Sequence, residues 1–132
     1  VTVVYGDVVK DLENDFGILS GDDIMLRYST ELPDVERAVF AIGGVDGILR
    51  VPPSKAGPED LIETWSPDME FEGEHAAEID VTGGIGLKAA RGAMISQKGV
   101  AVQIINGEYS DRVLAALEGE SVLGTKIVSG NC

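Results

Sequence analysis

Two mainly apolar runs constrain the fold of this chain more than any other feature. They are Ala38–Ile42, which is continuous, and Ala101–Ile105, which only Gln103 interrupts. Short runs of this kind are typical of strands covered on both faces in a parallel sheet. Each run leads into a glycine-containing turn, Gly43–Gly47 or Asn106–Gly107, and helical patterns separate them. This alternation predicts an α/β fold, a mostly parallel sheet sandwiched between helices.

Length and charge narrow the possible functions. The 132 residues suit a single domain over 1–132. With 10 basic and 23 acidic residues the formal net charge is −13, which disfavours nucleic-acid backbones and anionic membrane surfaces as partners. No apolar stretch approaches the ~20 residues that span a bilayer, no leader is visible, and the lone Cys132 cannot form an internal disulfide. We therefore expect a soluble, cytoplasmic protein that binds neither nucleic acid nor membrane.

Turn and capping signals predict the remaining elements. In the first half of the chain we expect a hairpin around 10–15, a helix from Ser20 that Pro33 stops, a short strand over 48–51 and a short helix over 59–65. A mobile acidic loop over 66–78 and a helix from about 80 to 98, ended by a left-handed Gly99, should follow. The last elements are a helix over 111–118, capped by Ser110 and ended by Gly119, and a strand over 124–128. Ser20 is expected to accept a hydrogen bond from the amide of Asp23.

Three glycine turns should converge on one rim, because ligands of parallel α/β sheets bind beyond the carboxyl ends of the strands. The turns are Tyr5–Asp7, Gly43–Gly47 and Asn106–Gly107. The helices that start at Ser20 and Thr82 should point their free amides at the same rim, which favours an anion. The rim is therefore the predicted binding site.

The segment Asp80–Lys88 is the strongest candidate for a phosphate site. Gly83 and Gly84 let the backbone approach a phosphate closely, and the side chain of Lys88 can reach back over the helix start opened by Thr82. The pattern is neither a P-loop nor a dinucleotide fingerprint. The alternative is an ordinary glycine-rich helix start with a solvated lysine.

The acidic residues at two further turns can likewise be interpreted either as site residues or as ordinary structural residues. Asp22 and Asp23 could hold Mg²⁺ or orient a phosphate-bearing substrate, since hard cations prefer carboxylate oxygens. They are equally suited to the first turn of a helix. Asp46 follows a buried strand, but Val-Asp-Gly is also a common turn.

Six blocks, taken in order, resemble the carboxyl-terminal half of the amino acid kinase superfamily, and most closely the archaeal isopentenyl phosphate kinases. The blocks are Val3–Val8, Ile18–Ile24, Ala38–Phe40 leading to Val45–Ile48, Asp80–Lys88, Ile104–Gly107 and Gly124–Thr125. The resemblance spans nearly the whole chain apart from 52–78. It implies phosphoryl transfer from ATP, with Mg²⁺, to a small phosphorylated substrate.

The resemblance also implies roles for individual residues. Lys88 matches the lysine on the ATP phosphates, and Gly84, with Thr82 and Gly83 beside it, belongs to the same nucleotide site. Asp46 and Gly47 match the turn near the adenosine. Gly21 and Asp22, with Gly6, match the turns on the acceptor side.

The sequence departs from the family in two respects. Gly43-Gly44 stands where the family has a threonine and a carboxylate, and nothing matches the family's amino-terminal phosphate loop or its histidine segment. We therefore expect the chain to be an inactive fragment or one of two pieces, docking to a separate amino-terminal half or self-associating. The alternatives are a non-catalytic nucleotide-binding or structural remnant, and an enzyme of this fold with another acceptor, such as a nucleoside monophosphate.

Overall fold

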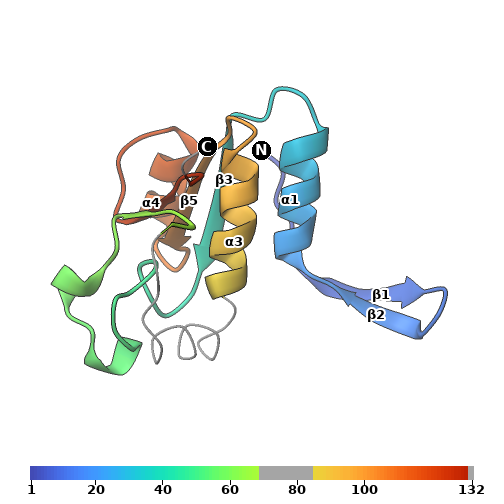
Figure 1. Ribbon diagram of the computed structural model, residues 1–132, viewed down its shortest axis with the longest axis horizontal. Helices are drawn as coiled ribbons and strands as arrows, with labels where there is room; N and C mark the ends of the chain where they lie inside the picture. Colours follow the sequence, from blue (N-terminus) through green and yellow to red (C-terminus); the bar gives the residue numbers. More distant parts are fainter. Residues whose placement is uncertain (69–84, 131–132) are drawn as a thin grey trace.

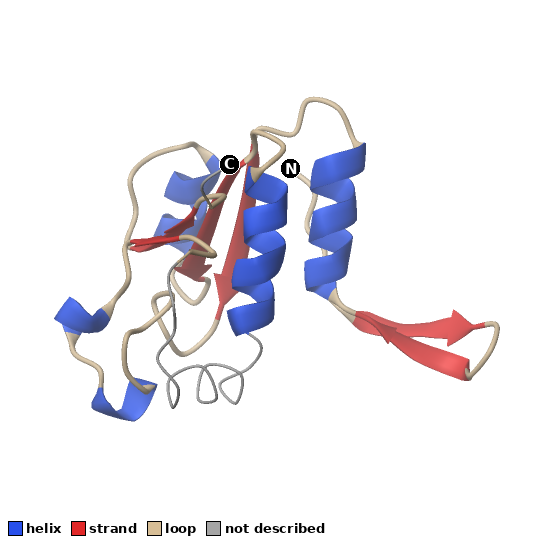
Figure 2. Ribbon diagram, viewed as in Figure 1, coloured by secondary structure: helices blue, strands red, loops and turns tan. Residues whose placement is uncertain are grey.

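The centre of the molecule is a four-stranded sheet of order β3-β5-β6-β4 (Figures 1 and 2). The computed structural model describes residues 1–68 and 85–130. The strands are β3 (Arg37–Ile42), β5 (Ala101–Asn106), β6 (Gly124–Ile127) and β4 (Thr64–Trp65). The pairs β3–β5 and β4–β6 are parallel and β5–β6 is antiparallel. The predicted mostly parallel α/β sheet is confirmed.

Helices pack on both faces of this sheet. Helix α3 (Ile85–Ser96) buries Ala89 and Ala93 in one cluster with Val102 and Ile104 of β5. Helix α4 (Ser110–Leu117) contacts β3 and β5, and Figure 1 shows it behind the sheet while α3 lies in front. Helix α1 (Gly21–Glu31) packs beside α3 rather than directly on the sheet.

Strand β3 is less covered than its apolar sequence predicts. Ala38 and Phe40 are buried against the core, but Val39 is half-buried and Ala41 is exposed. The prediction of two covered faces is wrong for this strand, because the elements packed on its second face leave Val39 half-buried and Ala41 exposed.

The predicted hairpin is present at the amino-terminal side of α1. Strands β1 (Asp7–Asp11) and β2 (Asp15–Leu19) pair antiparallel, and Figure 1 shows them projecting away from the sheet. Its turn is held by Asp11, which accepts hydrogen bonds from the backbone amides of Glu13 at 2.8 Å and Asn14 at 3.3 Å.

The segment between β3 and α3 differs most from expectation. Residues 48–51 form no strand, only one isolated bridge between Leu49 and Leu61. Residues 59–65 form no α-helix. Two 3₁₀ turns, η1 (Pro53–Lys55) and η2 (Pro58–Asp60), precede β4, since each proline fits a helix start but prevents a continuous helix.

Helix ends agree better with the sequence. Gly99 and Gly119 both have positive φ, +86° and +81°, and α1 ends before Pro33. Ser110 is the first helical residue of α4, not its cap, and the side chain of Tyr109 at the cap position makes no capping hydrogen bond. The predicted acidic loop over 66–78 and the helix start over 80–84 lie largely outside the described residues. None of the helices in the described ranges is long and apolar enough to cross a bilayer.

Candidate functional site

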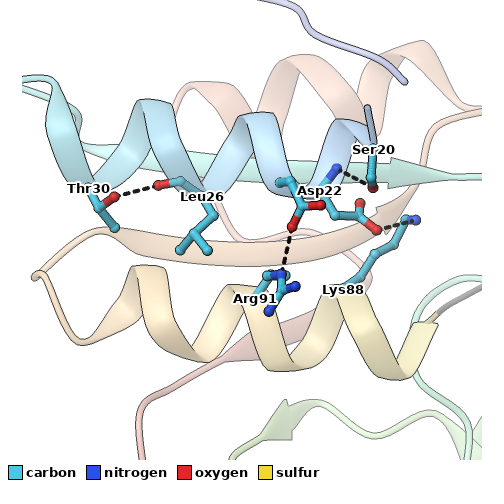
Figure 3. A network of polar contacts seen from close by, with 7 residues as sticks. Ser20, Asp22, Leu26, Thr30, Lys88 and Arg91 are labelled. Carbon is cyan, nitrogen blue, oxygen red and sulfur yellow. Dashed lines mark hydrogen bonds and ion pairs between the residues drawn. The ribbon is translucent and has the colours of Figure 1, made fainter. Parts of the chain in front are cut away.

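The first turns of α1 and α3 lie side by side at the end of the sheet where β3 and β5 finish (Figures 1 and 3). Both helices run in the same direction, so the positive ends of both dipoles meet there. The predicted helix start at Ser20 therefore lies beside the first described turn of α3, which begins at Ile85, while the predicted start at Thr82 lies outside the described residues.

Lys88 reaches back toward α1 and does not point into solvent. Its Nζ donates to Oδ2 of Asp22 at 3.2 Å, and the exposed fractions of the two side chains are 23% and 11% (Figure 3). An ammonium carries three donors, so this pair leaves hydrogen-bonding capacity on Nζ. Lys88 is therefore placed to meet an anion at the rim.

A hollow of about 370 Å³ brings the predicted acceptor residues to Lys88. Gly6, Gly21 and Asp22 line it together with Lys88. The two glycines are in close backbone contact, since a Cβ on Gly21 would lie 3.1 Å from the amide nitrogen of Gly6. Side chains larger than hydrogen would push the two turns apart.

A second ion pair, which the sequence analysis missed, joins the same two helices. Nε of Arg91 donates to Oδ1 of Asp23 at 2.9 Å (Figure 3). Arg91 stands one turn after Lys88 and so faces the same side of α3. The three-residue spacing of Lys88 and Arg91, together with the adjacent Asp22 and Asp23 on α1, is the feature of the sequence from which this second ion pair could have been predicted. Two parallel ion pairs thus fix α1 against α3.

The cap of α1 is shifted by one residue from the expected geometry. Ser20 Oγ accepts from the amide of Asp22 at 3.1 Å, not from that of Asp23. The function of the cap is unchanged, because both amides belong to the orphan donors of a first helical turn.

The turns after β3 and β5 meet as predicted. The amide of Gly107 donates to the carbonyl of Ile42 at 2.7 Å. Asp46 accepts from Arg112 Nη1 at 2.7 Å and from Asn106 Nδ2 at 3.4 Å. The guanidinium of Arg112 also lies over the ring of Tyr109. Asp46 is therefore engaged by a cation from α4 that the sequence analysis did not identify.

Close packing explains why a glycine stands at position 47. A Cβ there would lie 2.5 Å from Oγ1 of Thr125 and 3.1 Å from the side chain of Leu61. Asp46, with Gly44, lines a second hollow of about 380 Å³ that Lys88 does not border. The structure thus separates the predicted adenosine turn from the Lys88 group, while Thr82, Gly83 and Gly84 lie outside the described residues.

The described residues offer no preformed cage for a metal ion. Asp22 and Asp23 each face a cationic partner, and no cluster of three or more His, Cys, Asp or Glu side chains suited to a metal occurs within 1–68 and 85–130.

Comparison with known proteins shows which kinases this chain is similar to. No family model matches the chain. Isopentenyl phosphate kinases from Methanothermobacter thermautotrophicus and Thermoplasma acidophilum are 34% and 37% identical over 130 and 131 residues. Each alignment covers 96% of this chain and 48% or 50% of the relative. The chain is thus related to the carboxyl-terminal half of the isopentenyl phosphate kinases.

Solved structures agree with this relationship. An isopentenyl phosphate kinase described as a substrate complex matches 93% of this chain and 46% of its own, with 34% identity and a TM-score of 0.63. The product complex of the Thermoplasma acidophilum enzyme gives 31% identity and a TM-score of 0.61. The chain spans about half the length of the kinases it matches, and the family resemblance seen in the sequence is confirmed.

Proposed function

We propose that this chain supplies the ATP-phosphate side of a kinase of the isopentenyl phosphate kinase type. In that reaction the γ-phosphoryl group of ATP passes to a phosphate oxygen of isopentenyl phosphate, and ADP leaves. The observation that carries the proposal is the position of Lys88 between two helix starts, in one hollow with Gly6 and Gly21. The kinase relatives make ATP the expected nucleotide.

The geometry suits phosphoryl transfer because this chemistry depends on positioning and on neutralising charge that spreads over phosphoryl oxygens. Lys88 would contact the ATP phosphates from α3, with Thr82, Gly83 and Gly84 as further nucleotide residues. Gly21 at the start of α1, with Gly6, would meet the acceptor's phosphate. The distance between these helix starts is fixed by the pairs Lys88–Asp22 and Arg91–Asp23.

Mg²⁺ fits this site only as a companion of the nucleotide. Asp22 and Asp23 are already neutralised by Lys88 and Arg91. Mg²⁺ is commonly held by substrate phosphates with few protein carboxylates, so we propose that it arrives with ATP. It would neutralise phosphate charge when bound.

Turnover is proposed to require a counterpart of the other half of the relatives, since the chain spans only about half their length. We also propose a cytoplasmic location, where ATP is available. The turn Gly43–Gly47 favours a second candidate, a non-catalytic nucleotide-binding protein. It departs from the family pattern, and its Asp46 is engaged by Arg112. The acceptor could equally be another small phosphate, such as a nucleoside monophosphate.

Calorimetric titration with MgATP tests the proposal. We expect the wild-type chain to bind ATP and Lys88→Ala to lose at least tenfold in affinity. Lys98→Ala removes the same charge from an exposed position just beyond α3 and should bind like the wild type. Equal binding by all three proteins, or by none, would refute the proposed nucleotide site. ADP release with isopentenyl phosphate, measured on this chain joined to the unmatched part of a kinase relative, then separates the kinase from the non-catalytic binding protein.

A further inference from the structure

Four charged side chains lie between α1 and α3, and their charges balance. Asp22 and Asp23 come from α1, and Lys88 and Arg91 come from α3. Figure 3 shows the two ion pairs, of 3.2 Å and 2.9 Å, bridging the helices. The pairs influence each other, because the two carboxylates are adjacent in the sequence and the two cations are one helical turn apart.

The two cations differ in their access to a ligand. Among the described residues, the hollow of about 370 Å³ is bordered by Lys88 and Asp22 but not by Arg91 or Asp23. The side chains of Arg91 and Asp23 are 31% and 44% exposed and lie beside the hollow. A ligand in the hollow can therefore contact Lys88, whereas Arg91 acts on that ligand through its charge.

Lys88 is useful to a phosphate only while it keeps hydrogen-bond donors free. Its ammonium has three donors, and one of them is directed at Asp22. Asp23 is the adjacent carboxylate, which would attract the same ammonium. Its Oδ1 is instead occupied by Nε of Arg91 at 2.9 Å, and a guanidinium stays charged at every pH of interest.

Removing Arg91 would change the charge that an incoming phosphate meets. The two carboxylates and two cations sum to zero, and without Arg91 they leave one negative charge. Lys88 would then be drawn toward both aspartates, and the uncompensated carboxylate would repel an anion. Such repulsion is weakly screened over the short distance within one interface.

We propose that Arg91 is a positioning residue for Lys88. By neutralising Asp23, it leaves Lys88 paired with Asp22 alone and keeps the remaining donors of the ammonium available for phosphate. The inference rests on the proposed function for the identity of the ligand, ATP. The charge balance on which Lys88 depends is independent of that identity.

A purely structural role for Arg91 predicts a different outcome. If the pair with Asp23 serves only to tie α1 to α3, then Arg91→Gln and Asp23→Asn break the same tie and should be equally harmful. The double variant should then be no better than either. If Arg91 neutralises Asp23, only Arg91→Gln harms the site, and Asp23→Asn repairs it.

Calorimetric titration of the full chain with MgATP tests this difference. We expect Arg91→Gln to weaken binding about 3- to 10-fold, because it leaves a negative charge near the phosphates. Asp23→Asn, the double variant and the charge-conserving Arg91→Lys should bind within about twofold of the wild type. Arg27→Gln is the matched control, since it breaks the exposed pair of Arg27 with Glu31 on α1. Circular dichroism checks that each variant folds.

A second measurement needs no nucleotide. The NMR signal of the Lys88 ammonium, assigned by its loss in Lys88→Ala, reports which carboxylates the ammonium meets. In the wild type, where Arg91 occupies Asp23, Asp23→Asn should leave this signal nearly unchanged. In Arg91→Gln, the same substitution should shift it clearly.

The outcomes separate this proposal from the proposed function. Unchanged ATP affinity in Arg91→Gln, or a loss that Asp23→Asn does not restore, overturns the role of Arg91 while ATP binding by the wild type supports the nucleotide site. If the wild type does not bind ATP, the proposed function is refuted and the NMR measurement judges Arg91. A Lys88 signal that responds to Asp23→Asn equally with and without Arg91 would overturn the proposal.

Discussion

The ammonium of Lys88 lies 3.2 Å from the carboxylate of Asp22, across the interface between α3 and α1. This pair joins the residue proposed to contact ATP to the turn proposed to meet the acceptor. Both side chains are mostly buried, where charge interactions are less screened than on the surface. The pair therefore couples the two halves of the candidate site.

Asp22→Asn should tighten ATP binding about 3- to 10-fold while lowering the melting temperature. The carboxylate competes with phosphate for Lys88 and repels its charge, and two unit charges 4 Å apart interact by about 1 kcal/mol even in water. Calorimetry with MgATP measures the affinity. Asp23→Asn is the control, because its carboxylate is 44% exposed and pairs with Arg91 instead. Weaker ATP binding by Asp22→Asn would mean that Asp22 positions Lys88 or the metal, and does not compete with the nucleotide.

Gly47→Ala should destabilise the fold by about 2–3 kcal/mol, a typical cost of overpacking. The added Cβ would meet Oγ1 and the amide nitrogen of Thr125 at 2.5 and 3.0 Å. Gly43→Ala, in the same turn, would meet only Glu108 at 3.8 Å and should stay within about 0.5 kcal/mol of the wild type. Urea unfolding compares the two variants. If Gly47→Ala keeps its stability but loses ATP, the nucleotide role of Gly47 is favoured over packing.

The elements that the sequence predicted well are those set by local pattern. The apolar runs of β3 and β5, the polar interruption of the hairpin and the stop at Pro33 all act within a few residues. Their bounds in the structure match the expected ones closely. The direction of the Lys88 side chain, back toward the amino end of its helix, could be predicted from its position in the first turns of that helix.

What could not be predicted depends on partners far along the chain. Thr125, from β6, holds the segment 48–62 in place through hydrogen bonds to the backbone of Ile48 and Ile62, and the sequence of that segment does not show this partner. Likewise the pairs that engage Asp23 and Asp46 come from arginines 68 and 66 residues away. A sequence pattern shows which side of a helix an arginine faces, but not which element packs there.

Thr125→Val should cost about 2–4 kcal/mol, more than Thr125→Ser. Oγ1 of Thr125 accepts from the amide of Ile48 at 2.9 Å and donates to the carbonyl of Ile62 at 2.6 Å. Valine keeps the shape but leaves both buried groups without this partner, at about 1–3 kcal/mol each. Serine keeps the hydroxyl and loses one methyl group, worth about 1 kcal/mol. Thermal unfolding ranks the variants, and the reverse order would show that packing, not hydrogen bonding, dominates here.

The hairpin turn should weaken at acidic pH through Asp11. Hydrogen bonds from the backbone amides of Glu13 and Asn14, and then from the side chain of Asn14, hold the pKa of Asp11 below its ordinary 3.8. A carboxyl whose pKa is lower in the folded state stabilises that state above its unfolded pKa. The contribution is lost as pH falls through the folded pKa. NMR titration should therefore give Asp11 a midpoint below 3.8, with β1–β2 pairing weakening over the same range. Asn14→Ala removes only the side-chain donor and should raise the pKa of Asp11 part of the way back. A wild-type midpoint at or above 3.8 would contradict this account of the turn.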